Sequence, residues 1–147
     1  MSLISTLKTY GQIGVDVLRQ AIAPIDATGK TQNSIRYVVI EEEDRLIFLA
    51  RNYFHLLEKG RRPTSKNPSP AMIENLTEYA KARGMENPKS AAWAIAKTIN
   101  KEGDKTFRKG GRVLYSDVMD TFTKDLREAL AKDFGLTMKK ELKAAFK

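Results

Sequence analysis

The sequence from residue 34 to residue 50 is SIRYVVIEEEDRLIFLA. In its first seven residues Ile35, Tyr37 and Val39 share one side, and β-branched and aromatic residues dominate, which is typical of a β-strand. The acidic run that follows is too charged to be buried and predicts a solvated turn. The last five residues are continuously apolar, which predicts a second strand covered on both faces. These features together predict an antiparallel hairpin.

The predicted hairpin needs other elements to cover it, because an isolated hairpin is only marginally stable in water. Apolar residues at steps of three or four, with capping residues before them and glycine after, predict helices on both sides of it. The predicted helices are 3–22, 53–59 capped by Asn52, 70–83, 88–102, 116–134 ended by Gly135, and a short continuation capped by Thr137 that carries Met138, Leu142 and Phe146. The fold class is therefore α+β: a helix-rich single domain, 1–147, with one antiparallel β-hairpin and a long amphipathic C-terminal helix.

Two glycines interrupt the apolar side of the first helix. Gly11 and Gly14 each cost a helix about 1 kcal/mol relative to alanine. They indicate either a mildly unstable helix or a face where another backbone passes closely, within the domain or from a neighbouring subunit. Because one hairpin among several helices is a thin sheet, sheet extension between subunits is also expected. The candidate subunit-packing residues are Gly11, Gly14, Ile35, Tyr37 and Val39.

The composition excludes several classes of protein. At 147 residues and 41% hydrophobic, the chain suits one domain. No apolar run approaches the roughly 18 residues that cross a bilayer, and the N-terminus lacks the basic and apolar regions of a secretory signal. We therefore expect no membrane contact. The absence of cysteine excludes disulfides, thiolate zinc sites and cysteine nucleophiles.

No residues form a recognisable catalytic or metal-binding pattern. His55 is the only histidine, and we expect an ordinary, partly buried side chain. The acidic run 41–44 lacks the spacing and the glycine of an EF-hand loop, so a solvated turn is favoured over a cation site. We expect no catalytic residue, no metal and no cofactor.

The net charge of the chain is concentrated in two predicted loops, one after the helix 53–59 and a flexible one at 104–112 that contains Gly110 and Gly111. The sequence has 26 Lys and Arg residues against 18 Asp and Glu, a formal net charge of +8. Loops of this kind can follow nucleic-acid phosphates without reading sequence, or they can serve solubility or contact an acidic protein surface. The basic residues that face a partner or DNA in this hypothesis are Lys59, Arg61, Arg62 and Lys66 in the first loop and Lys105, Arg108, Lys109 and Arg112 in the second.

The order of several short motifs resembles a known family. Thr28-Gly29-x-x-x-x-Ser34-Ile35 precedes the hairpin, and Tyr53-Phe54-x-x-Leu57-Glu58-x-Gly60 follows it. Later come Ala94-Ile95-Ala96-x-x-Ile99-x-x-Glu102-Gly103, Phe107-Arg108-x-Gly110 and the amphipathic C-terminal helix. This arrangement, over roughly residues 3–146, resembles the neck and tail-completion (head–tail joining) proteins of tailed bacteriophages. The segment after Gly60, Arg-Arg-Pro-Thr-Ser, is more basic than expected for that family.

The resemblance implies a non-enzymatic structural protein of the virion, assembled in the host cytoplasm. It implies a homo-oligomeric ring between the portal or connector and the tail, with neck, portal or tail proteins as partners and non-specific contact with DNA in the channel. It also implies that Thr28-Gly29 is a tight turn into the hairpin and that Glu58-Lys59-Gly60 is a helix stop before the basic loop. The alternative is a non-specific nucleic-acid-binding module; a metal-dependent nuclease ranks far below both.

Overall fold

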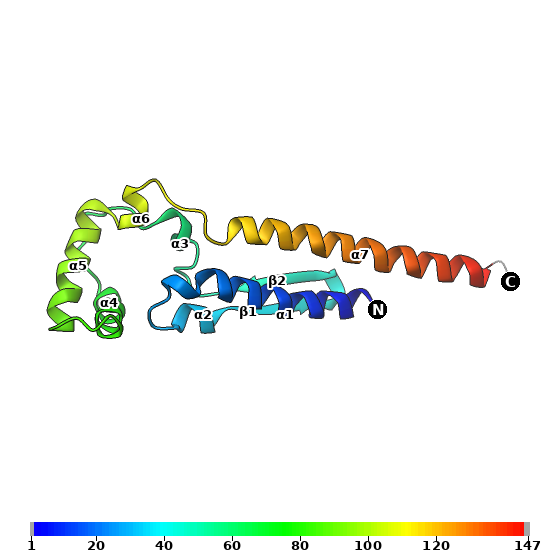
Figure 1. Cartoon of the computed structure of the whole chain (residues 1–147), viewed down its shortest axis with the longest axis horizontal. Helices are drawn as coiled ribbons and strands as arrows, with labels where there is room; N and C mark the ends of the chain where they lie inside the picture. The colour runs from blue at the N-terminus through cyan, green and yellow to red at the C-terminus, as the bar shows by residue number, and fades with distance from the viewer. Residues whose placement is uncertain (1, 146–147) are drawn as a thin grey trace.

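The computed structural model describes residues 2–145. Phe146, expected in the last apolar stripe, lies outside the described residues. The fold is α+β and helix-rich, with one two-stranded antiparallel sheet and a long C-terminal helix (Figure 1). The elements are α1 (Leu3–Ile22), η1 (Ala23–Ile25), α2 (Lys30–Ser34), β1 (Arg36–Ile40), η2 (Glu41–Glu43), β2 (Arg45–Leu49), α3 (Leu56–Lys59), α4 (Pro70–Ala82), α5 (Pro88–Glu102), α6 (Lys105–Arg108) and α7 (Ser116–Ala145).

Strands β1 and β2 form the predicted hairpin. Tyr37 pairs with Phe48 in the antiparallel register, and the side of the sheet that carries both side chains packs against α1. The prediction that the second strand is covered on both faces is wrong. On the opposite side of the sheet, Val38 and Leu49 remain 41% and 37% exposed, because the helices pack on one side only.

The glycines of α1 allow the helix and the sheet to approach closely. A β-carbon on Gly11 would collide with the Tyr37 ring, and one on Gly14 would collide with the Phe48 ring. Both glycines are buried, and Ile35 is 1% exposed. Of the alternatives that the sequence leaves open, the structure shows close packing within the chain for these glycines.

The apolar residues form two separate clusters. The first combines Val15, Leu18 and Ile22 of α1 with Ile35 before β1. The second lies between α4 and α5, where Met72 and Ile73 pack against Ala92 and Ala96. The α4–α5 pair therefore has its own small core at the end of the molecule opposite the free end of α7 (Figure 1).

Helix α7 is one continuous helix, so the prediction of a break at Gly135 and a new cap at Thr137 is wrong. The Thr137 hydroxyl donates to the Asp133 carbonyl, 3.0 Å away, as a threonine inside a helix does. A glycine weakens a helix but ends one only when the backbone turns to positive φ, and Gly135 stays helical. The last turns of α7 extend beyond the rest of the molecule (Figure 1).

Three other local predictions are corrected. Thr28-Gly29 leads into the short helix α2 before the hairpin begins. Helix α3 begins at Leu56, and its N-cap position is His55, since residues 52–55 form a turn. The segment 104–112, expected to be a flexible loop, contains α6, because the Asp104 carboxylate accepts a hydrogen bond from the Phe107 N–H at 2.8 Å and caps that helix. Within residues 2–145, no helix combines the length and the apolar character needed to span a bilayer.

Candidate functional site

The two basic segments, about 45 positions apart in the sequence, meet at one junction. The Arg112 N–H donates to the Glu58 carbonyl at 2.8 Å, and the Asp104 N–H donates to the Arg61 carbonyl at 3.0 Å. The Arg112 side chain adds a third link, since its Nε donates to the Leu57 carbonyl at 2.8 Å. The site is therefore one surface, held together by main-chain hydrogen bonds, where the sequence predicted two separate loops.

Glycines bring the two segments into direct contact around Phe107. Gly60 ends α3 with a φ of +81°, and a β-carbon on it would collide with the Phe107 backbone. Gly103 ends α5 and packs against the Phe107 ring. A larger residue at Gly60 would meet both a steric clash and an unfavourable backbone conformation.

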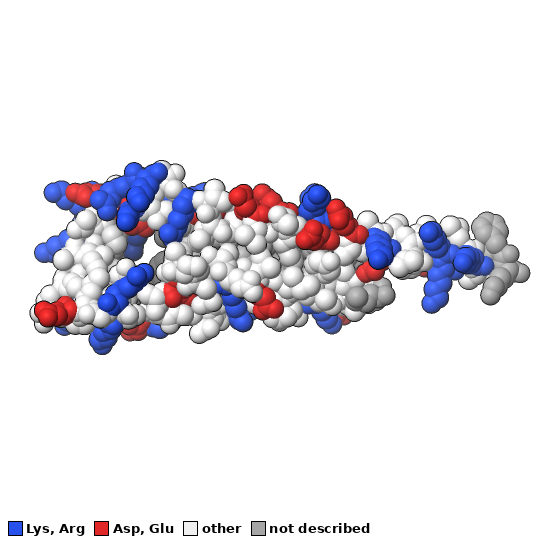
Figure 2. Space-filling view, in the orientation of Figure 1, with Lys and Arg blue, Asp and Glu red and all other residues white. Residues whose placement is uncertain are grey.

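The basic side chains of the junction point mostly to solvent. Figure 2 shows Lys and Arg gathered over the end of the molecule where α5, α6 and α3 lie. Arg108 forms an ion pair with Glu102, its Nη1 lying 3.6 Å from the Glu102 Oε2. Exposed are Lys59, Arg62, Lys66, Lys105, Arg108, Lys109 and Arg112, and Arg61 is partly buried.

Hydrogen bonds with α5 hold the segment that carries Lys66 at this surface. The Asn100 side chain donates to the Lys66 carbonyl at 2.9 Å, and the Thr64 N–H donates to the Asn100 carbonyl at 2.7 Å. Asn100 is only 7% exposed. One buried asparagine thus holds the basic segment 61–66 against the C-terminal end of α5.

A shallow pocket of about 520 Å³ opens beside the junction. Its lining includes His55, Lys59, Arg62 and Phe107 together with two glycines, and no acidic residue lines it. The sequence predicted a partly buried His55, but the side chain is exposed because residues 52–55 form a turn at the surface. A pocket lined by one lysine, one arginine and one histidine, with no carboxylate, suits an anionic group.

Glu58 lies behind the basic surface and binds the first turn of α7. Its Oε2 accepts hydrogen bonds from the Leu114 N–H and the Ser116 hydroxyl, both at 2.8 Å. Burial raises the pKa of Glu58, but the hydrogen bonds from Leu114, Ser116 and Tyr115 outweigh it and hold the pKa below its usual value. Burial and the charge of Glu58 together raise the pKa of Tyr115. A carboxylate at the positive end of a helix dipole also stabilises that helix.

The acidic turn between the strands is engaged by cations of the chain itself. Lys8 Nζ lies 2.7 Å from Glu41 Oε1, and Arg45 Nη2 lies 2.9 Å from Glu43 Oε2. Across the described part of the chain, no cluster of three or more His, Asp or Glu side chains is arranged to hold a metal ion.

Sequence reasoning found the basic residues of this site and missed what joins them. Glu58 was predicted only to precede a helix stop, although it also caps a helix more than fifty positions later. A signal was available, since α7 begins after Leu114 and Tyr115, which offer no capping side chain. No family model, curated protein or solved structure matches the chain.

Proposed function

We propose that this chain is a structural subunit of the neck or tail-completion assembly of a tailed bacteriophage. In this proposal it forms a homo-oligomeric ring between portal or connector and tail, within the virion, and contacts the neighbouring neck, portal or tail proteins. The order of motifs quoted above supports the proposal, since it resembles that family over most of the chain. The proposed role needs no catalytic group and no cofactor.

One structural observation carries the proposal. The motifs that follow the hairpin contact one another at the junction: Gly60, Gly103 and Phe107 pack together, and Glu58 of the second motif binds the residues at the start of α7. The contact of Gly60 with Phe107 joins motifs that are far apart in the sequence. Their convergence supports a shared structural unit, which is what a family resemblance requires.

The surface also supports a protein that works in an assembly. One side of the hairpin exposes Val38 and Leu49, and the far part of α7 exposes Phe134, Leu136 and Leu142. Exposed apolar surface of this kind marks interaction sites in soluble proteins. A two-stranded sheet also has two open edges, which favour pairing with another chain.

The experiment is to measure the mass of the purified chain by native mass spectrometry and to image it by negative stain, alone and with the portal and tail proteins encoded beside it. A ring of defined copy number supports the proposal. A chain that stays monomeric and binds none of these proteins overturns it.

The basic surface favours a second candidate, a non-specific nucleic-acid-binding module. Its side chains come from two segments and lie on one face, as phosphate contacts without sequence readout require. The two candidate functions predict different results for one variant, in which glutamine replaces Arg61, Arg62, Arg108 and Lys109. In a neck subunit the ring still forms, while DNA retention in the particle falls.

The matched control for that variant neutralises an equal number of exposed cations on the α4–α5 pair, namely Lys81, Arg83, Lys89 and Lys97. Both variants should fold normally, because exposed charges contribute little to stability, and the junction contact of the partly buried Arg61 is made by its main-chain carbonyl. Infectious particles of normal DNA content from the first variant would show that these charges serve solubility alone.

A further inference from the structure

The far part of α7 carries an apolar stripe that the chain itself leaves uncovered. Phe134, Met138 and Leu142 follow one another at steps of four, so they lie on one side of the helix. They are 68%, 41% and 51% exposed. Every described residue from Leu136 to Ala145 is exposed. This segment, residues 131–145, is called the tail of α7 below.

A groove of matching character lies between α1 and the first part of α7. It has a volume of about 370 Å³, and its apolar walls include Ile13 and Val118, which are 43% and 36% exposed. The remaining lining residues are Tyr10, Val17, Thr121 and Phe122 together with two carboxylates, Asp117 and Asp125, and no cation lines it.

The two halves of α7 carry opposite net charge. Residues 116–130 contain Asp117, Asp120, Asp125 and Glu128 against Lys124 and Arg127, whereas the tail contains Lys132, Lys139, Lys140 and Lys143 against Asp133 and Glu141. Figure 2 shows acidic side chains along the first part of α7 and basic ones on its projecting part. Lys139 lies beside the stripe, about 100° around the helix from Met138. A lysine side chain is long enough to reach a carboxylate at the rim of the groove while the apolar stripe is buried. The tail therefore complements the groove in charge as well as in apolar character.

The tail cannot occupy the groove of its own chain. The groove is built partly by residues 117–125 of α7, and the tail lies further along the same uninterrupted helix. We propose that the tail of one copy docks in the α1–α7 groove of a second copy. This inference rests on the proposed function, which already requires copies of the chain to associate, and it specifies which two surfaces meet.

The two surfaces also agree in length. Phe134 and Leu142 are eight residues apart, and so are Asp117 and Asp125, which corresponds to about 12 Å along a helix in both cases. A helix laid in this groove would contact α1 and α7 together, as in a helical bundle. Since the tail and the groove are different surfaces, the contact is head-to-tail and can close a ring.

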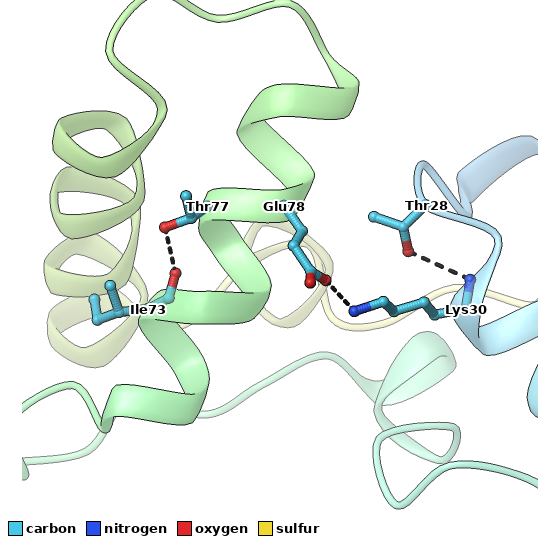
Figure 3. Close-up of polar contacts among 5 residues, drawn as sticks. All are labelled: Thr28, Lys30, Ile73, Thr77 and Glu78. Carbon is cyan, nitrogen blue, oxygen red and sulfur yellow. Dashed lines mark hydrogen bonds and ion pairs between the residues drawn. The ribbon is translucent and has the colours of Figure 1, made fainter.

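Two other apolar surfaces of the described residues complement the tail less well. The exposed side of the hairpin also carries Arg36 and Arg45, which would repel a basic segment. The pocket beside α4 and α5 has a volume of about 540 Å³ and is lined by two acids and two lysines. One of those acids, Glu78, is already paired with Lys30 of α2 (Figure 3).

Two double variants and one single-residue control test the contact. The tail variant is Met138→Asp with Leu142→Asp, and the groove variant is Ile13→Asp with Val118→Asp. The control is Leu136→Asp, because Leu136 is 56% exposed on the same segment but lies on the opposite side of the helix from the stripe. Circular dichroism confirms that each variant is folded, and mass photometry with light scattering measures its assembly.

We expect the wild-type chain and the control to form assemblies larger than a dimer, and the tail and groove variants each to be monomeric, with self-affinity at least tenfold weaker. An equimolar mixture of the two variants should give a heterodimer and nothing larger, because it retains one intact tail and one intact groove. A groove variant that failed to fold would leave the tail variant to decide.

Charge reversal gives an independent measurement. Asp117→Lys with Asp125→Lys should weaken assembly, and adding Lys139→Glu should restore it in part, because Lys139 is the lysine that lies beside the stripe. A tail variant that assembles like the wild type overturns the inference while leaving the proposed ring intact. A wild-type chain that is monomeric alone but assembles with portal or tail proteins also overturns the inference, and one that is monomeric in both settings overturns the proposed function as well.

Discussion

At the scale of single residues, Glu58 connects the basic junction to the longest helix. Its carboxylate accepts hydrogen bonds from Leu114 and Ser116, so it supplies a cap that residues next to α7 do not. Sequence neighbours usually provide such caps. Here the cap comes from Glu58 of α3. The position of α7 therefore depends on where α3 lies.

Replacing Glu58 by glutamine tests this connection. We expect Glu58→Gln to lower the free energy of unfolding by about 1 kcal/mol, because the amide keeps the size of the side chain but loses the charge that the N–H and hydroxyl donors bind. Urea denaturation measures the change. The control is Glu128→Gln on the exposed side of α7, which should be neutral within about 0.5 kcal/mol, and equal effects of the two changes would contradict the role.

The lowered pKa of Glu58 predicts a dependence of stability on pH. Because the folded-state pKa of Glu58 lies below the ordinary glutamate value of 4.5, the carboxylate stabilises the fold fully above that value. The unfolded chain binds a proton at Glu58 more readily than the folded chain does. As the pH falls through the folded-state pKa, this stabilising contribution of the Glu58 carboxylate is therefore lost. The difference in unfolding free energy between wild type and Glu58→Gln should therefore shrink between about pH 6 and about pH 3. A difference that stays constant would contradict the assigned hydrogen bonds.

At the scale of elements, glycines in two helices have opposite consequences. Gly11 packs against the Tyr37 ring, whereas a β-carbon on Gly135 would have no neighbour within 4 Å. We expect Gly135→Ala to stabilise the protein by up to about 1 kcal/mol through helix propensity. Gly11→Ala should destabilise it by about 1–3 kcal/mol, because the ring must move. Thermal unfolding of the two variants measures both, and shifts of the same sign would be inconsistent with this packing.

The elements that sequence predicted correctly are those with local signals. Ser69-Pro70 begins α4, and the Ser69 hydroxyl accepts from the Met72 N–H at 3.2 Å. Gly60 and Gly103 end helices as expected. The hairpin followed from alternation along β1. In each case, residues within a few positions of one another determine the structure.

The elements that sequence predicted wrongly depend on neighbours or on weak local signals. Gly135 was assigned as a break, yet a single glycine costs less than the rest of a long helix gains. The segment 104–112 was predicted as flexible because of its glycines and charges, but Asp104 and the hydrogen bonds to residues 58 and 61 order it. The meeting of the two basic segments depends on contacts between distant residues, which no local pattern records.

At the scale of the whole molecule, α7 is supported along only part of its length. Its first part packs against α1, where Phe122 is buried and Asp133 accepts a hydrogen bond from the Thr6 hydroxyl, whereas every described residue from Leu136 onward is exposed. We expect amide hydrogens of residues 136–145 to exchange much faster than those of residues 116–130 in the dilute monomer, because unsupported helical turns open locally. Hydrogen–deuterium exchange with mass spectrometry measures both segments. Equal protection along α7 in the monomer would contradict this account.

The basic junction predicts how the whole molecule responds to salt. If it contacts duplex DNA, the logarithm of the affinity should fall linearly with the logarithm of the salt concentration, by about 0.9 for each phosphate neutralised. Neutralising Arg62, Arg108 and Lys109 should reduce that slope. A filter-binding or anisotropy titration from about 50 mM salt upward measures it, and an absence of binding at the lowest salt would count against DNA contact.

The continuity of α7 through Gly135 also sets a fixed distance. Thr121 in the groove and Met138 on the stripe are joined by unbroken helix, which holds them about 26 Å apart. The length of this helix segment would then set the spacing between neighbouring copies. Deleting a single residue between them would shorten that spacing by about 1.5 Å and turn the stripe by about 100°. Changes of length should therefore be far less tolerated in this part of α7 than changes of sequence.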